Sequence, residues 1–311
     1  MVVIKQLEDL KKINNSVLTV GSFDGLHLGH KKIISCLTKL SKINKIPSVI
    51  ITFNPNPYYI IEKSPKNNCI SSLDEKLEIF NYWGVDYVFI LNFNNTIAKI
   101  TADKFLKIFI VEKFNPAYIV VGYDNCFGNN REGNKDFLNK RKYLYNYTIK
   151  SVHPRKIDDV IISSSVIRKK IRSGNMGTVS KYLGRMYRVK GLVVKGDGRG
   201  SKDLLPTANL KLIFSKQIIP CSGVYCVEAV IDKINYMGIC NIGNRPTFYQ
   251  NGELTIEVHL LSKEYLNIYG KIVDLKFKKF IRHEQSFHDK FDLLEQLKID
   301  KESCREQSII N

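Results

Sequence analysis

The stretch Val17-Leu-Thr-Val-Gly-Ser-Phe-Asp-Gly-Leu-His-Leu-Gly-His30 joins an apolar strand to the start of a helix. Residues 17–20 are apolar or β-branched and predict a buried strand. Glycines at positions 21 and 25 mark the turn that follows, and a helix is expected to open near residue 27. A helix that opens directly after a strand presents unpaired backbone N–H groups and the positive end of its dipole. The stretch therefore predicts an anion-binding site.

Two histidines in this stretch point to chemistry on a phosphate group. The H-x-G-H spacing brings His27 and His30 to the helix start, and Gly29 between them carries no side chain where a phosphate must come close. Two ring N–H donors can stabilise the negative charge that develops on an α-phosphate during nucleotidyl transfer. The alternative is a turn that contains two histidines by chance. Because the chain has only 6 histidines and the surrounding motif G-x-F-D-G-x-H-x-G-H is long, the functional interpretation is favoured.

Length and composition fit a two-domain protein. The 311 residues are enough for two domains of common size. The first nine residues contain acidic side chains and no apolar core of a signal peptide, and no apolar run approaches the roughly 20 residues that span a bilayer. The 7 cysteines form no C-x-x-C pair, which disfavours a zinc site or a disulfide framework. We therefore expect a cytoplasmic protein with no membrane association.

The charge of the chain is strongly positive, at +18. Nucleic acid is nevertheless disfavoured as the primary ligand, because the lysines are scattered in the way that an AT-rich genome produces rather than gathered in blocks. Phosphorylated small molecules would also benefit from a positive field. We expect small-molecule substrates and a monomer or weak oligomer.

The first part of the chain, to about residue 184, alternates short apolar runs with helical stretches. This alternation predicts an α/β doubly wound, Rossmann-like domain over residues 1–184. Ligands of such sheets bind beyond the carboxyl ends of the strands, which is where the glycine-containing turn lies. The expected strands are 17–20, 48–53, 87–91 and 118–121, and the expected helices are 30–42, 73–82, 102–112 and 133–145.

The second part, residues 185–311, is rich in alternating β segments separated by turn signals. This pattern predicts a small antiparallel β-barrel. An amphipathic helix is expected near the end of the chain. The expected strands are 188–194, 222–231, 234–242, 253–261 and 272–280, and the expected helix is 286–304.

A second motif in the first part is Ile161-Ile-Ser-Ser-Ser-Val-Ile-Arg168. Its serines precede a periodic run and predict a helix start with exposed hydroxyl and N–H donors. Arg168 lies one turn into that helix, where its guanidinium can reach a triphosphate. Alone, an ordinary serine cap beside a solvated arginine would be the better interpretation, but the H-x-G-H motif upstream favours the functional one. The candidate ATP- and phosphate-binding residues of this part are Gly21, Phe23, Asp24, Gly25, Gly29, Ser164 and Ser165.

The barrel part carries its own motifs. The stretch Gly191-Leu-Val-Val-Lys-Gly-Asp-Gly-Arg-Gly200 is a strand that runs into a glycine-rich turn, whose backbone N–H groups could wrap a phosphate. Pro206-Thr-Ala-Asn209 follows, which alone would be interpreted as a surface turn. Glu257 lies on a strand whose apolar residues alternate with it and face the other side. The candidate phosphate-binding residues of this part are Gly196, Gly198 and Gly200.

Together these motifs resemble the bacterial bifunctional riboflavin kinase/FAD synthetase family. The H-x-G-H and I-S-S-S-x-x-R motifs resemble its adenylyltransferase module, and Pro206-Thr-Ala-Asn209 resembles the P-T-A-N motif of its riboflavin kinases. The resemblance extends over nearly the whole chain. Supporting fragments in family order are 52–57, 82–87, 121–128, 241–248 and 257–259.

The resemblance implies two enzymatic activities. An FMN adenylyltransferase (FAD synthetase) domain would occupy residues 1–184, and a riboflavin kinase domain would occupy residues 185–311. The second domain would phosphorylate riboflavin with ATP to give FMN, and the first would adenylylate FMN to FAD and release pyrophosphate. The implied substrates are riboflavin, FMN and ATP, and the implied cofactor is Mg²⁺.

The resemblance also implies roles for individual residues. Those implied to be catalytic in adenylyl transfer are His27, His30 and Arg168. Glu257 would be the general base that takes the proton of the flavin ribityl hydroxyl. Thr207 and Asn209 would bind the metal ion through oxygen atoms. The residues implied to lie on the flavin side are Asn56, Asp124 and Arg282.

Departures from the family pattern leave alternatives open. Asn56 stands where the family usually has histidine, and it cannot carry a proton or charge. The residues around Asp124 differ as well, and Leu204-Leu205 replaces a Gly-Phe pair. One alternative is a riboflavin kinase whose adenylyltransferase half is weakened or lost. Others are a different H-x-G-H transferase, disfavoured by the P-T-A-N motif, and a basic flavin- or RNA-binding protein without turnover, disfavoured by the intact catalytic residues.

Overall fold

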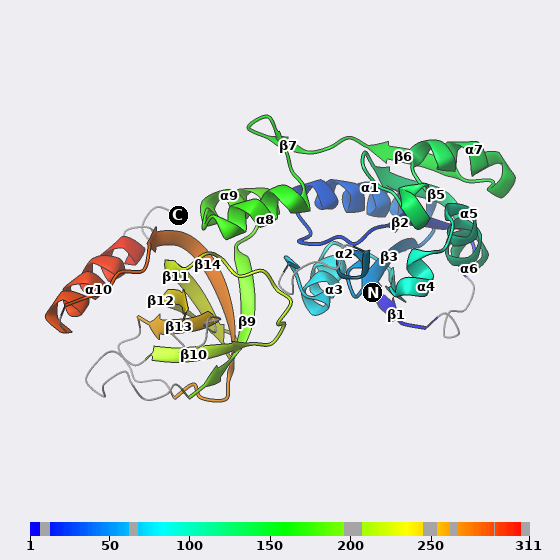
Figure 1. Cartoon of the computed structure of the whole chain (residues 1–311). Helices are drawn as coiled ribbons and strands as arrows, with labels where there is room; N and C mark the ends of the chain where they lie inside the picture. Colours follow the sequence, from blue (N-terminus) through cyan, green and yellow to red (C-terminus); the bar gives the residue numbers. More distant parts are fainter. Residues whose placement is uncertain are drawn as a thin grey trace. The chain divides into compact units, whose positions relative to one another are not determined.

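The computed structural model describes residues 1–6, 13–61, 68–195, 207–244, 254–261, 267–288 and 290–305. The chain divides into two compact units, Met1–Ser164 and Ser165–Asn311 (Figure 1). The first unit contains a parallel sheet covered by helices, and the second contains a closed antiparallel barrel followed by a helix. The predicted fold class is therefore confirmed.

The sheet of the first unit has 6 strands, all parallel, in the order β1-β4-β3-β2-β5-β6. All four predicted strands are present within it. The two edge strands were not predicted, because one has only 3 residues and the other, Thr-Ile-Lys-Ser-Val, has no apolar run. The strands are β1 (Val2–Ile4), β2 (Ser16–Val20), β3 (Ser48–Asn54), β4 (Tyr87–Asn92), β5 (Pro116–Gly122) and β6 (Thr148–Val152).

Helices cover both faces of this sheet, which makes it doubly wound. Alternate residues of β2 enter different cores: Val17 packs with α1 (Leu28–Asn44) and α3 (Leu73–Tyr82), whereas Leu18 packs on the opposite face. The elements on that opposite face are α5 (Ala102–Phe105), the π-helical segment η1 (Leu106–Val111), α6 (Glu112–Phe114) and α7 (Lys135–Tyr145). The smaller elements are α2 (Pro57–Ile61), α4 (Asn95–Ala98), η2 (Asn129–Arg131) and the hairpin β7 (Lys156–Ile157)–β8 (Val160–Ile161).

The barrel of the second unit closes in the order β10-β13-β12-β11-β14-β9. Five of its strands correspond to predicted ones. The sixth, β10, was not predicted, because its first residues were interpreted as a turn motif; it pairs with β9 and β13 and so closes the barrel. The strands are β9 (Tyr187–Val194), β10 (Thr207–Leu212), β11 (Gly223–Ile231), β12 (Ile234–Asn244), β13 (Leu254–Leu260) and β14 (Ile272–Arg282).

Alternate residues of the barrel strands face inward and outward. Tyr225 and Phe277 are fully buried and pack edge to face at 5.4 Å between ring centroids. Their neighbours along β11, Val224 and Cys226, form a separate apolar cluster with Cys304 of α10 (Lys290–Arg305). The C-terminal helix therefore packs against the outer side of the barrel, beside β12 (Figure 1).

Two helices precede the barrel, α8 (Ser164–Arg172) and α9 (Met176–Leu183). Helix α9 packs against β9 and β14. It buries Met176, Val179, Tyr182 and Leu183. The second compact unit thus begins earlier than the predicted domain boundary at residues 184/185, which stays a prediction. Among the described residues, no helix is long and apolar enough to cross a membrane.

These contacts predict how two fragments of the chain differ in stability. A fragment starting at residue 165 should unfold at a temperature roughly 10 °C or more above that of a fragment starting at residue 185. The reason is that each of the four buried side chains of α9 contributes about 1.5–3 kcal/mol of apolar burial. Thermal unfolding of both fragments, followed by circular dichroism, measures this difference. Equal unfolding temperatures would show that the folded domain begins at residue 185 and does not depend on α9.

Candidate functional site

The turn after β2 lies where the order of the sheet changes direction. Strands β3 and β4 lie on one side of β2, and β5 and β6 lie on the other. Open parallel sheets bind ligands in the crevice that such a reversal leaves at the carboxyl ends of the strands. The Asn125 side chain, which follows β5, spans this edge and donates to the Val20 carbonyl oxygen at 2.8 Å. The turn for which an anion site was predicted thus lies at the expected edge of the sheet.

The backbone of the turn adopts an unusual conformation. Phe23 and Leu26 have φ values of 48° and 41°, although neither is glycine, and Gly25 has φ of 82°. Left-handed φ values are costly for residues with a β-carbon, so the surroundings must hold them in place. Both side chains are buried in the core beneath α1 and α3. Phe23 packs edge-on against the His30 ring, with centroids 5.3 Å apart.

The two histidines are organised by the start of α1. His27 is the N-cap residue, and its Nδ1 accepts a hydrogen bond from the His30 backbone N–H at 3.3 Å. A ring nitrogen that accepts is unprotonated, so in the neutral ring Nε2 carries the proton and is a donor. The two rings stack at 3.7 Å between centroids, 18° from parallel. The helix start therefore combines backbone N–H groups with an imidazole N–H donor, as stabilisation of a phosphate oxyanion requires.

Gly29 lies close against the His27 ring. A β-carbon added at this position would lie 3.0 Å from Cε1 and Nδ1 of His27. Gly21 is similarly close to the Phe23 ring, at 3.1 Å from an added β-carbon. These glycines let aromatic rings fold back over the backbone, which adds a packing reason to their predicted role beside a phosphate.

Asp24 faces the protein interior. Its side chain is only 2% exposed, and its carboxylate accepts from the backbone N–H groups of Ile70 and Ser71 at 3.0 and 3.2 Å. Its carbonyl oxygen accepts from the Ser164 hydroxyl at 2.9 Å. The Asp24 side chain therefore connects the turn to residues 70 and 71. Its carbonyl oxygen connects the turn to Ser164, the first residue of α8. Whether either residue also contributes to ATP binding stays a prediction.

Ser165 and Arg168 continue along α8. Ser165 is exposed, and Arg168 is half-buried one helical turn beyond Ser164. The division into units assigns both residues to the second unit. Their predicted roles at the phosphates therefore stay predictions.

Two of the predicted flavin-side residues follow strands that flank β2. Asn56 follows β3, and its side-chain oxygen accepts from the Tyr58 N–H at 3.2 Å at the start of α2. Asp124 follows β5 and is exposed, with a carboxylate oxygen 3.8 Å from where a β-carbon of Gly122 would lie. Both residues therefore lie at the same edge of the sheet as the H-x-G-H turn. Their role toward the flavin stays a prediction.

In the barrel, strand register places three polar residues in one row. Glu257 of β13 pairs directly with Asn209 of β10 on one side and with Asn241 of β12 on the other. Directly paired residues share a face of a sheet. The neighbours of Glu257 along its strand, Ile256 and Val258, are buried in the barrel interior, so the row of three faces outward. A carboxylate and two amides thus meet on the outer surface.

The surroundings of Glu257 are partly shielded from water. Glu257, Asn209 and Asn241 are all half-buried. The Asn241 amide donates to the Glu284 carboxylate at 3.4 Å. Burial raises the pKa of the neighbouring Cys240 thiol, and the negative charge of Glu257 raises it further.

The same row fits a hard metal ion. Asn209 offers an amide oxygen beside Glu257, and the other predicted metal ligand, Thr207, lies two residues before Asn209 on β10. Within the described ranges, no group of three or more His, Cys, Asp and Glu side chains could hold a metal ion. The predicted ligands Thr207 and Asn209 would suit an ion such as Mg²⁺, which uses one or two protein oxygens and takes its other ligands from nucleotide phosphates and water. The Thr207 side chain and the predicted Gly196, Gly198 and Gly200 lie outside the described structure.

Arg282, the third predicted flavin-side residue, forms an ion pair at the end of β14. Its guanidinium contacts both carboxylate oxygens of Asp300 in α10 at 2.9–3.2 Å, and Asp300 is fully buried. Removing either partner would leave a buried charge uncompensated. This ion pair holds α10 against the barrel, which gives Arg282 a structural role. A role toward the flavin stays a prediction.

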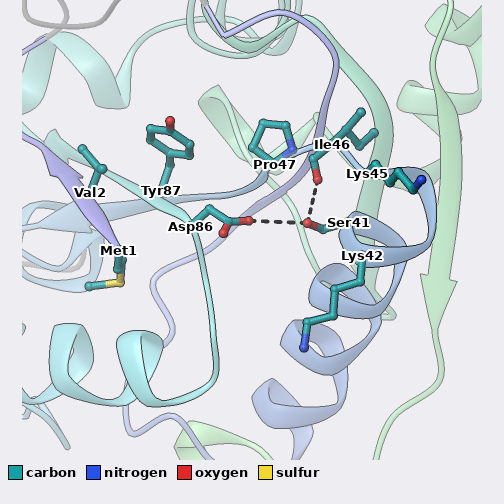
Figure 2. Close-up of a pocket in the computed structure, with 9 residues that line it drawn as sticks. All are labelled: Met1, Val2, Ser41, Lys42, Lys45, Ile46, Pro47, Asp86 and Tyr87. Carbon is teal, nitrogen blue, oxygen red and sulfur yellow. Dashed lines mark hydrogen bonds between the residues drawn. The ribbon is translucent and has the colours of Figure 1, made fainter.

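A cavity of about 530 Å³ lies elsewhere in the first unit, near the amino ends of β1, β3 and β4 (Figure 2). None of the predicted site residues lines it. Its carboxylate, Asp86, accepts hydrogen bonds from the Ser41 hydroxyl and from both the N–H and the hydroxyl of Ser48. Lys42 and Lys45 extend in different directions from its rim (Figure 2). The cavity is therefore separate from the candidate site at the carboxyl ends of the strands.

Two residues beneath the H-x-G-H turn were not predicted. The Ser22 carbonyl oxygen accepts from the Lys76 ammonium at 3.1 Å and from the Thr52 hydroxyl at 3.4 Å. A signal for Lys76 was present, because it shares a helix face with Leu73 and Phe80, where an apolar residue is expected. Thr52 gave no such signal, since threonine is common in strands.

The chain matches two family models, described as FAD synthetase over residues 9–166 and as riboflavin kinase over residues 183–308. It is 34% identical over 306 residues to the bifunctional riboflavin kinase/FMN adenylyltransferase of Buchnera aphidicola subsp. Schizaphis graminum, with 97% of each chain covered. The protein of the same description from Escherichia coli K12 is 33% identical over 293 residues, which cover 93% of this chain and 92% of that protein. A solved structure described as a macrolide-efflux protein from Streptococcus pneumoniae superposes with a TM-score of 0.88 at 29% identity, over 98% of this chain and 99% of that chain.

Proposed function

The chain belongs to the bifunctional riboflavin kinase/FMN adenylyltransferase family, and we propose that it makes FAD from riboflavin in two steps at two sites. The barrel transfers the γ-phosphoryl group of ATP to riboflavin and produces FMN. The parallel-sheet unit transfers the adenylyl group of a second ATP to FMN and produces FAD and pyrophosphate. The observation that carries this proposal is the presence of both family modules in one chain.

The adenylyl transfer is assigned to the turn between β2 and α1. A phosphate oxygen of FMN attacks the α-phosphorus of ATP, and the bond to the departing pyrophosphate breaks. His27 supports this step by donating from Nε2, since its Nδ1 is engaged with the His30 backbone. The His30 ring, stacked on His27, is the second donor. Arg168 binds the phosphates of ATP through its planar guanidinium.

The kinase reaction is assigned to the outward row on the barrel. Glu257 accepts the proton of the ribityl hydroxyl as that oxygen bonds to the γ-phosphorus, while the bond from the γ-phosphorus to the bridging oxygen breaks and ADP leaves. Asn209, directly opposite Glu257, and Thr207 would hold the divalent ion. When bound, that ion neutralises charge on the transferring phosphates. Binding of the ATP phosphates is the role predicted for the glycines at 196, 198 and 200, which lie outside the described residues.

We further propose Mg²⁺ as the divalent ion, ATP as the phosphoryl and adenylyl donor, and the cytoplasm as the compartment. Riboflavin kinases and FMN adenylyltransferases act on small molecules, and the scattered positive charge of this chain suits phosphorylated substrates. Nothing in the geometry favours a chain with only one of the two activities.

The direct test is to follow the flavins made by the pure protein. Incubation with riboflavin, ATP and Mg²⁺ should yield FMN first and FAD later, resolved by chromatography. Chelation of Mg²⁺ by EDTA should stop both steps, because the nucleotide phosphates need the ion. Accumulation of FMN without FAD would show that the protein has riboflavin kinase activity but no adenylyltransferase activity. Absence of both products would leave a flavin-binding protein without turnover.

Replacement of His30 should affect only the second step. His30→Ala removes a donor to the developing phosphate charge, so the rate of FAD formation from added FMN should fall on the order of 10²–10³-fold. FMN formation from riboflavin in the same tube is the internal control and should keep the wild-type rate. An equal fall in both rates in a folded protein would contradict the assignment of one activity to each unit.

Replacement of Glu257 should affect only the first step. Glu257→Gln keeps the size and hydrogen bonding of the side chain but removes the base, so kcat for FMN formation should fall roughly 10²–10⁴-fold. Riboflavin and ATP affinities should change little, because the base acts in the transition state. The measurement is FMN formation at saturating substrates, with conversion of added FMN to FAD as control. A wild-type rate would remove Glu257 from this role.

A further inference from the structure

Lys76 is a charged residue buried beneath the H-x-G-H turn. It lies in α3 on the face that packs against the sheet, and only 5% of its surface is exposed. Burial lowers the pKa of its ammonium group, while the negative charge of Asp24 raises it. The ammonium donates to the Ser22 carbonyl oxygen at 3.1 Å. Because a buried cation is costly unless it is paired, these contacts on the turn are what retain it.

The contacts of Lys76 lie on both sides of Phe23, a residue of the turn with a positive φ. Ser22 on one side of Phe23 accepts from Lys76, and Asp24 on the other side is both its electrostatic partner and an acceptor for the N–H groups of Ile70 and Ser71. Phe23 itself has φ of 48°. Fixing the carbonyl before Phe23 and the carboxylate after it restricts the backbone from which the Phe23 ring extends.

The Phe23 ring transmits this constraint to the histidines. It packs edge-on against His30 at 5.3 Å and against Phe80 of α3 at 5.7 Å. His30 in turn stacks on His27 at 3.7 Å. A continuous series of contacts thus runs from the Lys76 ammonium through the turn to both imidazoles.

Stability alone does not explain a lysine at this position. Replacing a buried ion pair by apolar residues of similar volume is often neutral or stabilising, and the neighbouring positions on this face of α3 are Leu73, Leu77 and Phe80. A methionine would fit the same helix face without a charge. The burial of Lys76 also keeps it from touching a substrate directly.

We propose that Lys76 is a positioning residue for adenylyl transfer, holding the Ser22–Asp24 turn so that His27 and His30 meet the α-phosphate. The inference rests on the proposed function of the first unit. Misplacement of reacting groups by about 1 Å costs on the order of 10²-fold in rate. A small shift of this turn is therefore enough to slow adenylyl transfer measurably.

The test compares Lys76→Met with the wild-type chain and with Lys42→Met, a change at an exposed lysine of α1. For FAD formation from added FMN, Lys76→Met should lower kcat on the order of 10–100-fold and change KM for ATP by less than about threefold. Lys42→Met should behave as wild type. FMN formation from riboflavin should be unchanged in every variant, and thermal unfolding should show that each protein is folded at the assay temperature.

A double-mutant cycle separates positioning from a merely structural role. If Lys76 acts through the histidines, Lys76→Met should lower kcat by a smaller factor in a His30→Ala background than in the wild-type chain, because one of the two imidazoles it positions is gone. An equal loss in both backgrounds, a wild-type kcat, or a Lys76→Met protein that fails to fold would each overturn the inference. Absence of FAD from the wild-type reaction would instead contradict the proposed function itself.

Discussion

The first unit depends on holding one turn in a conformation that its residues do not favour. Phe23 and Leu26 have positive φ values without being glycine, and Gly25 between them does too. Two parts of the unit secure these positions: the core under α1 and α3 holds the two apolar side chains, and Gly25 lies close to the Ile70 side chain. The backbone carbonyls on either side are held by Lys76, Thr52 and Ser164. The turn needs this much support because strained backbone persists only where its surroundings over-determine it.

In the barrel, the position of the candidate site depends instead on strand register. Glu257, Asn209 and Asn241 lie in one row only because β13 pairs with β10 and β12 in the observed register. A shift of one residue would turn Glu257 into the barrel interior and bring Ile256 or Val258 outward. The buried alternate residues of these strands therefore determine where the polar row appears. The alternation of apolar and polar residues along these strands therefore determines both the packing of the barrel core and the position of Glu257.

Much of this organisation could be predicted from the sequence, because it depends on local patterns. Four strands of the sheet and five of the barrel follow from apolar runs, and the predicted helix 73–82 has the bounds of α3. Ser72 caps that helix and Asp74 and Glu75 stand in its first turn, which are strong local signals. The strands that were not predicted have weak local sequence signals. Strand β10 begins inside a motif interpreted as a turn, and β6 carries mostly exposed side chains.

The sequence by itself determined the fold class, the H-x-G-H and P-T-A-N motifs and the family to which they belong, because each is encoded within a few consecutive residues. Only the tertiary structure decided that Asp24 turns inward to Ile70, that His27 Nδ1 accepts from the His30 backbone N–H, and that Arg282 pairs with Asp300. It alone placed Lys76 under Ser22 and Asn209 opposite Glu257. Apart from the His27 cap, these are contacts between residues far apart in the chain. No periodicity or spacing encodes them, since they depend on which strands and helices become neighbours when the chain folds.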